Sequence, residues 1–521
     1  MATAATAQRA VATRTGPPLR RASLAAAVLA VCALAVLPFL ALAGFAVRDA
    51  GSGSLLLGAE GFEQLTNTLV LVVGVGLIGA LLGTANGWLT ACCRFPGRRW
   101  LRLAQVLPLA APAFVLAAVL VDLGSRWGFR VHGIGWAVLL LSLTTYSYVF
   151  LLSTESFSGS GQRQLEACRS LGVGPWGSFR RVALPLALPS IGAGVALSGM
   201  EVVNELGAVE LLGVPTLSRG ILQRWQAEGD LPGAVALALI ALVLVSLLVG
   251  TERWMRQRSR RWNLGQGDAG TLQWSLEGWR RLLAQLLTVL PPVISLGLPL
   301  TWLVASRDHL QSDPLEELLA LTLRSLGLAL VAAVLTVLAA LVLAISRRWL
   351  ANRLLGRLTF FAGMGYAVPG TVLALALMLI GGPLQLSPLL LLLWGYADRF
   401  MAVSKQGLDA SFEQIPPSLD ESATSLGCGW LAVLRRIHLP LLRGPLLVGG
   451  LLVFVDVVKE LPLTFSLRPF DFDTLSVRVY QYASDERVGA ALFPALLILA
   501  LGLAASIALM PSLERRERGG G

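Results

Sequence analysis

The sequence predicts an all-α, polytopic membrane protein with about twelve transmembrane helices in two parallel halves of six. Three observations support this prediction. Of the 521 residues, 55% are hydrophobic and only 14% are charged, and the mean hydropathy is +0.70. Apolar runs long enough to cross a bilayer, roughly 20 residues each, recur along the whole chain. A polar stretch between these runs occurs twice at a constant spacing, which indicates an internal duplication.

The apolar runs divide into two sets of six. The first set lies near residues 22–47, 66–91, 103–122, 135–154, 186–212 and 231–250, and the second near 284–305, 318–345, 358–381, 386–404, 444–467 and 488–510. The first run exceeds the roughly 7–15 apolar residues of a signal peptide, so we expect an uncleaved span. The predicted organisation is a cytoplasmic tail at 1–22, a first half at 23–250, a cytoplasmic linker at 251–283, a second half at 284–510 and a cytoplasmic tail at 511–521.

Positive charge indicates the topology. The formal charge is +11, and of the 42 basic residues only Lys405 and Lys459 are lysines. With the N-terminus inside, every arginine-rich segment falls on the cytoplasmic side: 9–21, 94–102, the two polar stretches, 253–281, 347–357 and 515–518. Both termini are therefore expected in the cytoplasm. A nucleic-acid partner is not expected, because spans interrupt the basic positions.

No enzyme or metal motif is evident. The five cysteines predict no disulfide framework, and the three histidines are dispersed, so each is interpreted as a loop or interfacial residue and no metal site is expected. Neither lysine follows a glycine-rich phosphate loop. We therefore expect no cofactor on this chain, and the energy for any transport must come from another subunit or from an ion gradient.

The duplicated stretch covers residues 166–185 and 421–440, and nine of its twenty positions are identical. Gly172 and Gly427 are expected to end a first helix in a left-handed cap. A second helix would then carry one apolar stripe beside an arginine pair. The final Leu-Pro is expected to stop that helix. The stripe residues are Trp176, Phe179 and Val182 in the first copy and Leu431, Leu434 and Ile437 in the second.

Two amphipathic helices on charged loops need a partner for their apolar stripes, and the alternative is a pair of helices lying on the lipid surface. The layout resembles the Glu-Ala-Ala (EAA) loop of ABC-importer permeases, here at 155–185 and 408–440, in which a coupling helix docks on the ATPase. Glu-Ala-Cys and Glu-Ser-Ala replace Glu-Ala-Ala. The resemblance implies ATPase-coupling roles for Glu166, Ala167, Ser170, Leu171, Gly172, Gly174, Arg180 and Arg181, and for Glu421, Ser422, Ser425, Leu426, Gly427, Gly429, Arg435 and Arg436.

Ionisable residues also lie inside apolar runs, where they are costly and mark candidate functional sites. They follow each EAA loop at matching places: Glu201, Glu205, Asp456, Lys459 and Glu460. Gly207 and Pro462 come two residues after Glu205 and Glu460 and would break the helix around a cavity. The interpretation stays open, since these groups either line a translocation pathway, pair with one another inside the bundle or sit at the outer interface.

Four strings in the second half, at 459–462, 467–470, 472–475 and 483–486, resemble the ferric-iron importer permeases. This resemblance implies a bacterial inner-membrane pore that receives Fe(III) from a periplasmic binding protein. Two copies of a cytoplasmic ATPase, which bind ATP and magnesium, would drive alternating access. Thiamine, polyamines and phosphonates are alternative solutes. A secondary carrier driven by an ion gradient is a further alternative, but it has no need of two matched coupling loops.

Overall fold

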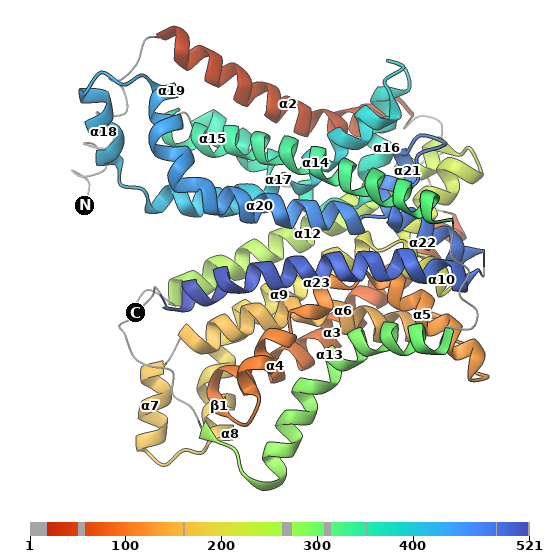
Figure 1. Ribbon diagram of the computed structural model, residues 1–521, viewed down its shortest axis with the longest axis vertical. Helices are drawn as coiled ribbons and strands as arrows, with labels where there is room; N and C mark the ends of the chain where they lie inside the picture. The colour runs from red at the N-terminus through yellow and green to blue at the C-terminus, as the bar shows by residue number, and fades with distance from the viewer. Residues whose placement is uncertain are drawn as a thin grey trace. The chain divides into compact units, whose positions relative to one another are not determined.

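The computed structural model describes residues 18–49, 58–159, 162–262, 274–306, 314–350, 353–363, 365–485 and 487–518. Regular structure in these ranges is almost entirely helical (Figure 1). The two short strands described, β1 (Cys93–Arg94) and β2 (Trp274–Ser275), pair in parallel. The prediction of an all-α polytopic protein is confirmed.

The helices follow the order of the apolar runs. Up to the linker they are α2 (Pro18–Asp49), α3 (Ala59–Cys92), α4 (Arg98–Ala104), η2 (Leu107–Ala110), α5 (Ala113–Arg126), α6 (Ile134–Gly159), α7 (Gln162–Ser170), α8 (Pro175–Ser178), η3 (Phe179–Ala183), α9 (Leu184–Asn204), α10 (Gly207–Leu211), α11 (Leu217–Leu222), η4 (Gln223–Ala227) and α12 (Leu231–Trp262).

After the linker a similar succession returns, without a counterpart of η4 in the described ranges. These elements are α13 (Gly278–Ser306), α14 (Leu315–Trp349), α15 (Arg353–Ala362), η6 (Gly365–Ala367), α16 (Gly370–Gly381), α17 (Pro388–Gln414), α18 (Pro417–Ser425), α19 (Trp430–Val433), η7 (Leu434–His438), α20 (Leu439–Lys459), α21 (Pro462–Leu467), α22 (Leu475–Ser484) and α23 (Val488–Arg518).

Eight described helices are long and apolar enough to cross a membrane, and four expected spans fall outside this set. The run at 103–122 belongs to a pair of helices that meet at an angle of 88°. The helix is interrupted there because Pro112, the residue before α5, has an extended backbone conformation. Pro369 does the same before α16, so the run at 358–381 is divided into short helices. The run at 386–404 lies in the 27-residue α17, which carries Asp398 and Arg399. The run at 488–510 lies within α23, and its described apolar stretch is Gly489–Ala504.

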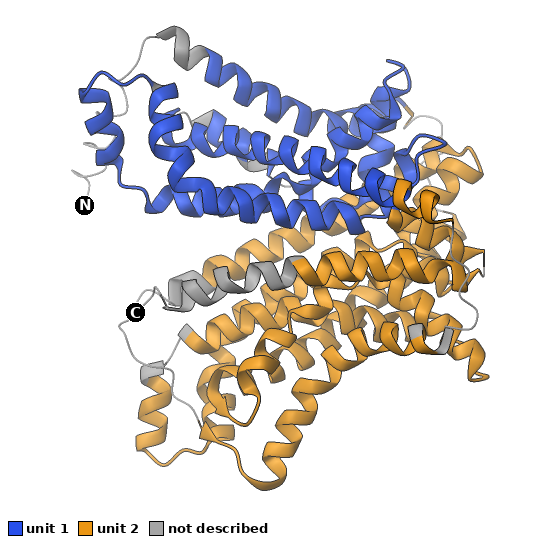
Figure 2. Cartoon of the chain, viewed as in Figure 1, with its two compact units in different colours: residues 1–48, 321–474 blue, residues 49–320, 475–521 orange. Residues whose placement is uncertain are grey.

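The compact units of the chain differ from the two halves of its sequence (Figure 2). Unit 1 comprises residues 1–48 and 321–474, and unit 2 comprises 49–320 and 475–521. The first described helix, α2, therefore packs with helices of the second half, where Trp394 donates a hydrogen bond to the carbonyl of Leu34 over 3.0 Å. Conversely, α13 packs in unit 2, where Trp302 donates to Asp122 over 2.8 Å. Each half thus contributes its first described helix to the unit built mainly from the other half, and α22 and α23 of the second half also belong to unit 2.

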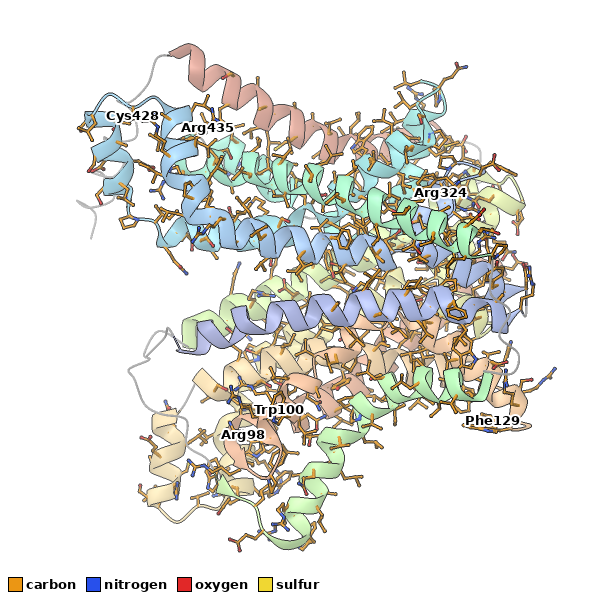
Figure 3. All side chains as sticks on the ribbon, in the orientation of Figure 1. Arg98, Trp100, Phe129, Arg324, Cys428 and Arg435 are labelled. Atoms are coloured by element: carbon orange, nitrogen blue, oxygen red, sulfur yellow. The ribbon has the colours of Figure 1, made fainter. Side chains whose placement is uncertain are left out.

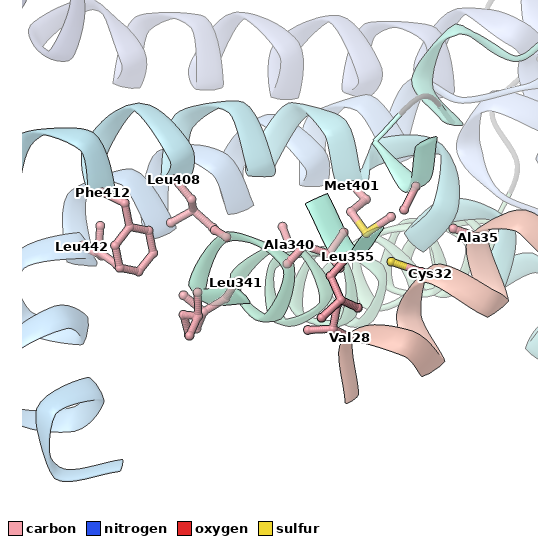
Figure 4. Close-up of a cluster of buried hydrophobic side chains, with 14 of the residues drawn as sticks. Val28, Cys32, Ala35, Ala340, Leu341, Leu355, Met401, Leu408, Phe412 and Leu442 are labelled. Carbon is pink, nitrogen blue, oxygen red and sulfur yellow. The ribbon is translucent and has the colours of Figure 1, made fainter. Parts of the chain in front are cut away.

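The cluster that holds α2 in unit 1 is apolar. Val28, Cys32 and Ala35 of α2 pack with Ala340 and Met401, and all five are buried (Figure 4). These side chains leave no polar group unsatisfied, so burial requires no compensating hydrogen bond. This contact explains why an N-terminal helix packs in a unit that is formed mainly by residues 321–474.

Small residues allow the helices to approach closely, as is common in membranes. Gly79, Gly83 and Gly87 follow one another every four residues along α3 and face α6. At the matching places of α14 stand Thr336, Ala340 and Ala344, which are all buried. The same equivalence holds for α9 and α20, where Gly194 lies against Val149 and Gly449 lies against Ser404, 255 residues further on. The duplication seen in the sequence is therefore present in the packing.

We predict that Gly83→Ala destabilises the protein. A Cβ at position 83 would lie 2.8 Å from the backbone nitrogen of Phe150, so α3 and α6 must separate, at a cost of about 1–3 kcal/mol. Thermal unfolding in detergent measures the effect. Gly79→Ala is the matched control, because its Cβ would lie 3.8 Å from Tyr146 in ordinary contact. Equal melting temperatures for the two variants would contradict the prediction.

Candidate functional site: two matched loops

Both loops begin with a helix that ends in the same backbone motif. After α7, the N–H of Gly172 donates to Arg169 and the N–H of Val173 donates to Cys168, over 3.0 and 2.9 Å. After α18, Gly427 and Cys428 donate to Thr424 and Ala423, each over 3.0 Å. The two glycines have φ of +74° and +80°, which side chains with a Cβ rarely adopt. The predicted left-handed caps are present in both copies, as Schellman motifs.

The prediction that Leu-Pro stops the second helix is wrong. In the first copy α8 continues through a π-helical turn, η3, into α9, and in the second copy α19 continues through η7 into α20. The N–H of Leu184 donates to Phe179, five residues back. The helix has therefore already left the i→i−4 pattern where Pro185 enters, so the missing proline N–H breaks no α-helical bond. Each loop helix and the following span form one helix, Pro175–Asn204 or Leu431–Lys459.

The loops display matching apolar side chains to the outside. Leu171 and its counterpart Leu426 are 80% and 84% exposed, and Trp176 and Leu431 are 71% and 49% exposed. Large exposed apolar groups beside charged ones are typical of a surface that a partner covers. Figure 3 shows Cys428 and Arg435 at the end of unit 1 opposite Arg324, so the second loop forms one end of its unit.

The other residues predicted for coupling lie on the same surfaces. All but the half-buried Gly429 are exposed: Glu166, Ala167, Ser170, Gly172, Gly174, Arg180 and Arg181 in the first loop, and Glu421, Ser422, Ser425, Gly427, Arg435 and Arg436 in the second. Each loop thus presents an acidic residue, two apolar side chains and an arginine pair. Their coupling role stays a prediction at this point.

The second loop also contains a charged network that the sequence did not reveal. Arg348, at the end of α14, donates to Asp420 of α18 over 2.6 Å and to the carbonyls of Phe412 and Ile415. His438 Nε2 lies 2.9 Å from the other carboxylate oxygen of Asp420. His438 lies in the second loop, as expected of a loop residue, but its side chain is fully buried. No local pattern signals this network, because its members are 18 and 72 residues apart from Asp420.

Opposing effects act on the pKa of the Asp420 carboxyl group. Burial raises the pKa of its carboxyl group, but the hydrogen bonds and charges of His438 and Arg348 outweigh burial and hold the pKa below its ordinary value. A carboxylate whose pKa is lowered by folding stabilises the folded state above its unfolded pKa of about 3.9, and this contribution is lost as the pH falls through the folded pKa.

We therefore predict that the second loop stays closed down to about pH 4 and opens below it. Hydrogen–deuterium exchange of residues 417–427, corrected for the intrinsic rate at each pH, measures this opening. Residues 164–172 of the first loop serve as the internal control, because Leu165 stands where Asp420 would be. An equal loss of protection in both loops, or opening already near pH 6, would contradict the prediction.

The acids predicted for the pathway lie where the spans break. After α9, Glu205 accepts a hydrogen bond from the N–H of Ala208 over 2.9 Å. After α20, Glu460 accepts from the N–H groups of Leu463 and Thr464, each over 2.9 Å. Both carboxylates therefore cap the short helix that follows, as carboxylates at helix N-termini do. The predicted helix breaks before Gly207 and Pro462 are present.

The remaining acids also bond within their own units. Glu201 accepts a hydrogen bond from Tyr148 over 2.9 Å, and Lys459 forms an ion pair of 2.9 Å with Asp456. These contacts fit the interpretation that the groups pair inside the bundle, whereas contact with a solute stays a prediction. Among the residues that the structure describes, no three His, Cys, Asp or Glu side chains gather as a metal site.

The fold defines a multi-pass membrane protein that carries two matched loops. A family model described as the binding-protein-dependent transport system inner membrane component matches residues 83–261 and again 336–519. Each match contains one of the loops. The chain belongs to this family of ABC-importer permeases, and it carries the family's domain twice.

Named relatives cover the chain to different extents. The Fe(3+)-transport system permease protein FbpB 2 of Haemophilus influenzae is 26% identical over 449 residues, which are 84% of this chain and 87% of that protein. The sulfate transport system permease protein CysT of Escherichia coli is 29% identical over 45% of this chain and 92% of its own length. The molybdenum transport system permease protein ModB of Escherichia coli is 29% identical over 34% of this chain and 86% of its own.

Proposed function

We propose that this chain forms the translocation pathway of an ABC importer for Fe(III), and that each loop binds one copy of a cytoplasmic ATPase. The observation that carries the proposal is the matched exposure of Leu171 with Leu426 and of Trp176 with Leu431. Two identical partner copies need two equivalent surfaces, and the duplication supplies them. Helices that merely lie on lipid have no need of the same caps and the same exposed positions in both copies.

The continuity of the helices supports a mechanism. A motion imposed on Trp176 passes along the 30-residue helix Pro175–Asn204, which is about 45 Å long, to the break capped by Glu205. The helix Leu431–Lys459 leads to Glu460 in the same way. Approach of the two ATPase copies on binding ATP would thus rock the spans between inward-open and outward-open states. ATP and magnesium bind on the ATPase, so this chain acts as a transport subunit and catalyses no reaction itself.

The arginine distribution supports the proposed orientation, and the family supports the proposed location and the direction of import. Arginine-rich segments would all be cytoplasmic with both termini inside, which puts the loops where an ATPase can reach them. A binding protein on the outer face of the inner membrane would deliver the solute, as the family description implies.

We propose iron as the solute because a relative that covers 84% of this chain and 87% of its own length is a ferric-iron permease. Carboxylates near the helix breaks suit a hard cation, which prefers oxygen ligands. The competing candidate is an oxyanion, because the sulfate and molybdenum permeases also match. Those two matches span less than half of this chain each.

We predict that Leu171→Glu with Leu426→Glu abolishes ATPase binding. Each exposed leucine contributes about 1.5–3 kcal/mol when a partner buries it, and a glutamate at the same place would have to be desolvated. Co-purification of the ATPase with the tagged chain from detergent measures binding. Phe470→Glu is the control, because Phe470 is fully exposed but lies outside both loops. Undiminished ATPase recovery with the double variant would refute the docking surface.

A further inference from the structure

The two loops are fastened to their units by different chemistry. The repeat places Leu165 where the second loop has Asp420, and Ala183 where it has His438. Leu165 and Ala183 are buried in an apolar cluster with Cys92 and Phe157. The same backbone positions are thus filled by an apolar contact in the first loop and by a charged network in the second.

The charged network joins several elements at once. The guanidinium of Arg348 bonds the carboxylate of Asp420 in α18 and the carbonyls of Phe412, Ile415 and Pro416 at the end of α17. On its other side, Asp420 faces His438 in the π-helical turn η7. The guanidinium of Arg348 therefore joins the end of α14 to α18 and to the connection from α17, and the carboxylate of Asp420 links α18 to the start of the helix that continues into the membrane.

We propose that Arg348, Asp420 and His438 are positioning residues for the second loop. We name them the second-loop clamp. The clamp fixes the orientation of α18, and hence of the exposed Leu426, relative to the helix Leu431–Lys459. This proposal rests on the proposed function, because the orientation matters for transport only if an ATPase binds there.

The clamp has a property that the first loop lacks. Charge-assisted hydrogen bonds are directional and are lost together when one partner is removed, whereas an apolar cluster such as that around Leu165 tolerates small displacements. Removing the charge of Asp420 should therefore release the second loop as a whole while the first loop stays in place. Hydrolysis of ATP would continue, but less of it would be converted into movement of the second set of spans.

Two native cysteines report on the two loops. Cys168 and Cys428 are free and half-buried, one in each loop, while Cys32, Cys92 and Cys93 are buried. We would measure the rate of maleimide labelling at both sites in the full chain reconstituted alone, because a bound ATPase would cover the loops. Uptake of radioactive iron per ATP hydrolysed would be measured for the same variants reconstituted with the ATPase and the binding protein.

With Asp420→Asn we expect labelling of Cys428 to accelerate about fivefold, which corresponds to about 1 kcal/mol, while labelling of Cys168 stays the same. Uptake per ATP should fall by a similar factor. His438→Ala should act in the same direction, and Asp420→Glu, which keeps the charge, should restore both readouts in large part. Glu413→Gln is the matched control, because it neutralises a nearby, exposed acid that pairs with Arg347 outside the clamp.

Unchanged Cys428 labelling and unchanged uptake per ATP in Asp420→Asn would overturn the proposal. So would equal acceleration at Cys168 and Cys428, which would mean general loosening, or failure of Asp420→Glu to recover either readout. Failure of the proposed function is distinguishable, because the wild-type chain would then retain no ATPase, while the labelling rates would still decide whether the clamp holds the loop.

Discussion

The rest of the structure depends on the unbroken backbone hydrogen bonding between each loop and the span that follows it. A helix cannot leave its backbone groups unpaired inside a bilayer, so the span from Leu184 or Leu439 must stay helical. The π-helical turns at Phe179–Ala183 and Leu434–His438 extend this helix into the loop in spite of the Leu-Pro sequence. A force on the loop therefore acts directly on the membrane segment. Each membrane segment ends at a helix break, where a glutamate caps the short helix that follows.

The duplication provides this arrangement twice and allows the two copies to diverge. The caps at Gly172 and Gly427, the exposed leucines and the glutamate-capped breaks agree between the copies. The contacts that hold each loop to its unit differ, because the second-loop clamp of one copy replaces the apolar cluster of the other. A single chain with two halves can evolve such differences, whereas two identical subunits cannot. Exchange of the first described helices between the units further ties the two halves into one protein.

Much of this could be predicted from the sequence because it depends on local patterns. The periodicity and length of the apolar runs predicted the helices, and a glycine after a polar helix predicted each left-handed cap. Local rules failed at Pro185 and Pro440, where a π-helical turn absorbs the proline, and they did not reveal the burial of His438, which a distant carboxylate holds in the interior. Packing of α2 with the second half was also beyond prediction. An apolar helix shows which face is buried but does not show which partner covers it.

The most direct test of the central claim is ATP-driven uptake of radioactive iron by vesicles that contain this chain, its ATPase and its binding protein. Wild type is compared with the Gly172→Pro/Gly427→Pro double variant, in which both loop caps are destroyed while the spans are left unchanged. The account predicts iron uptake by the wild type that excess molybdate or sulfate does not reduce, and no uptake by the inserted double variant. Equal uptake by both proteins, or uptake of molybdate in place of iron, would contradict it.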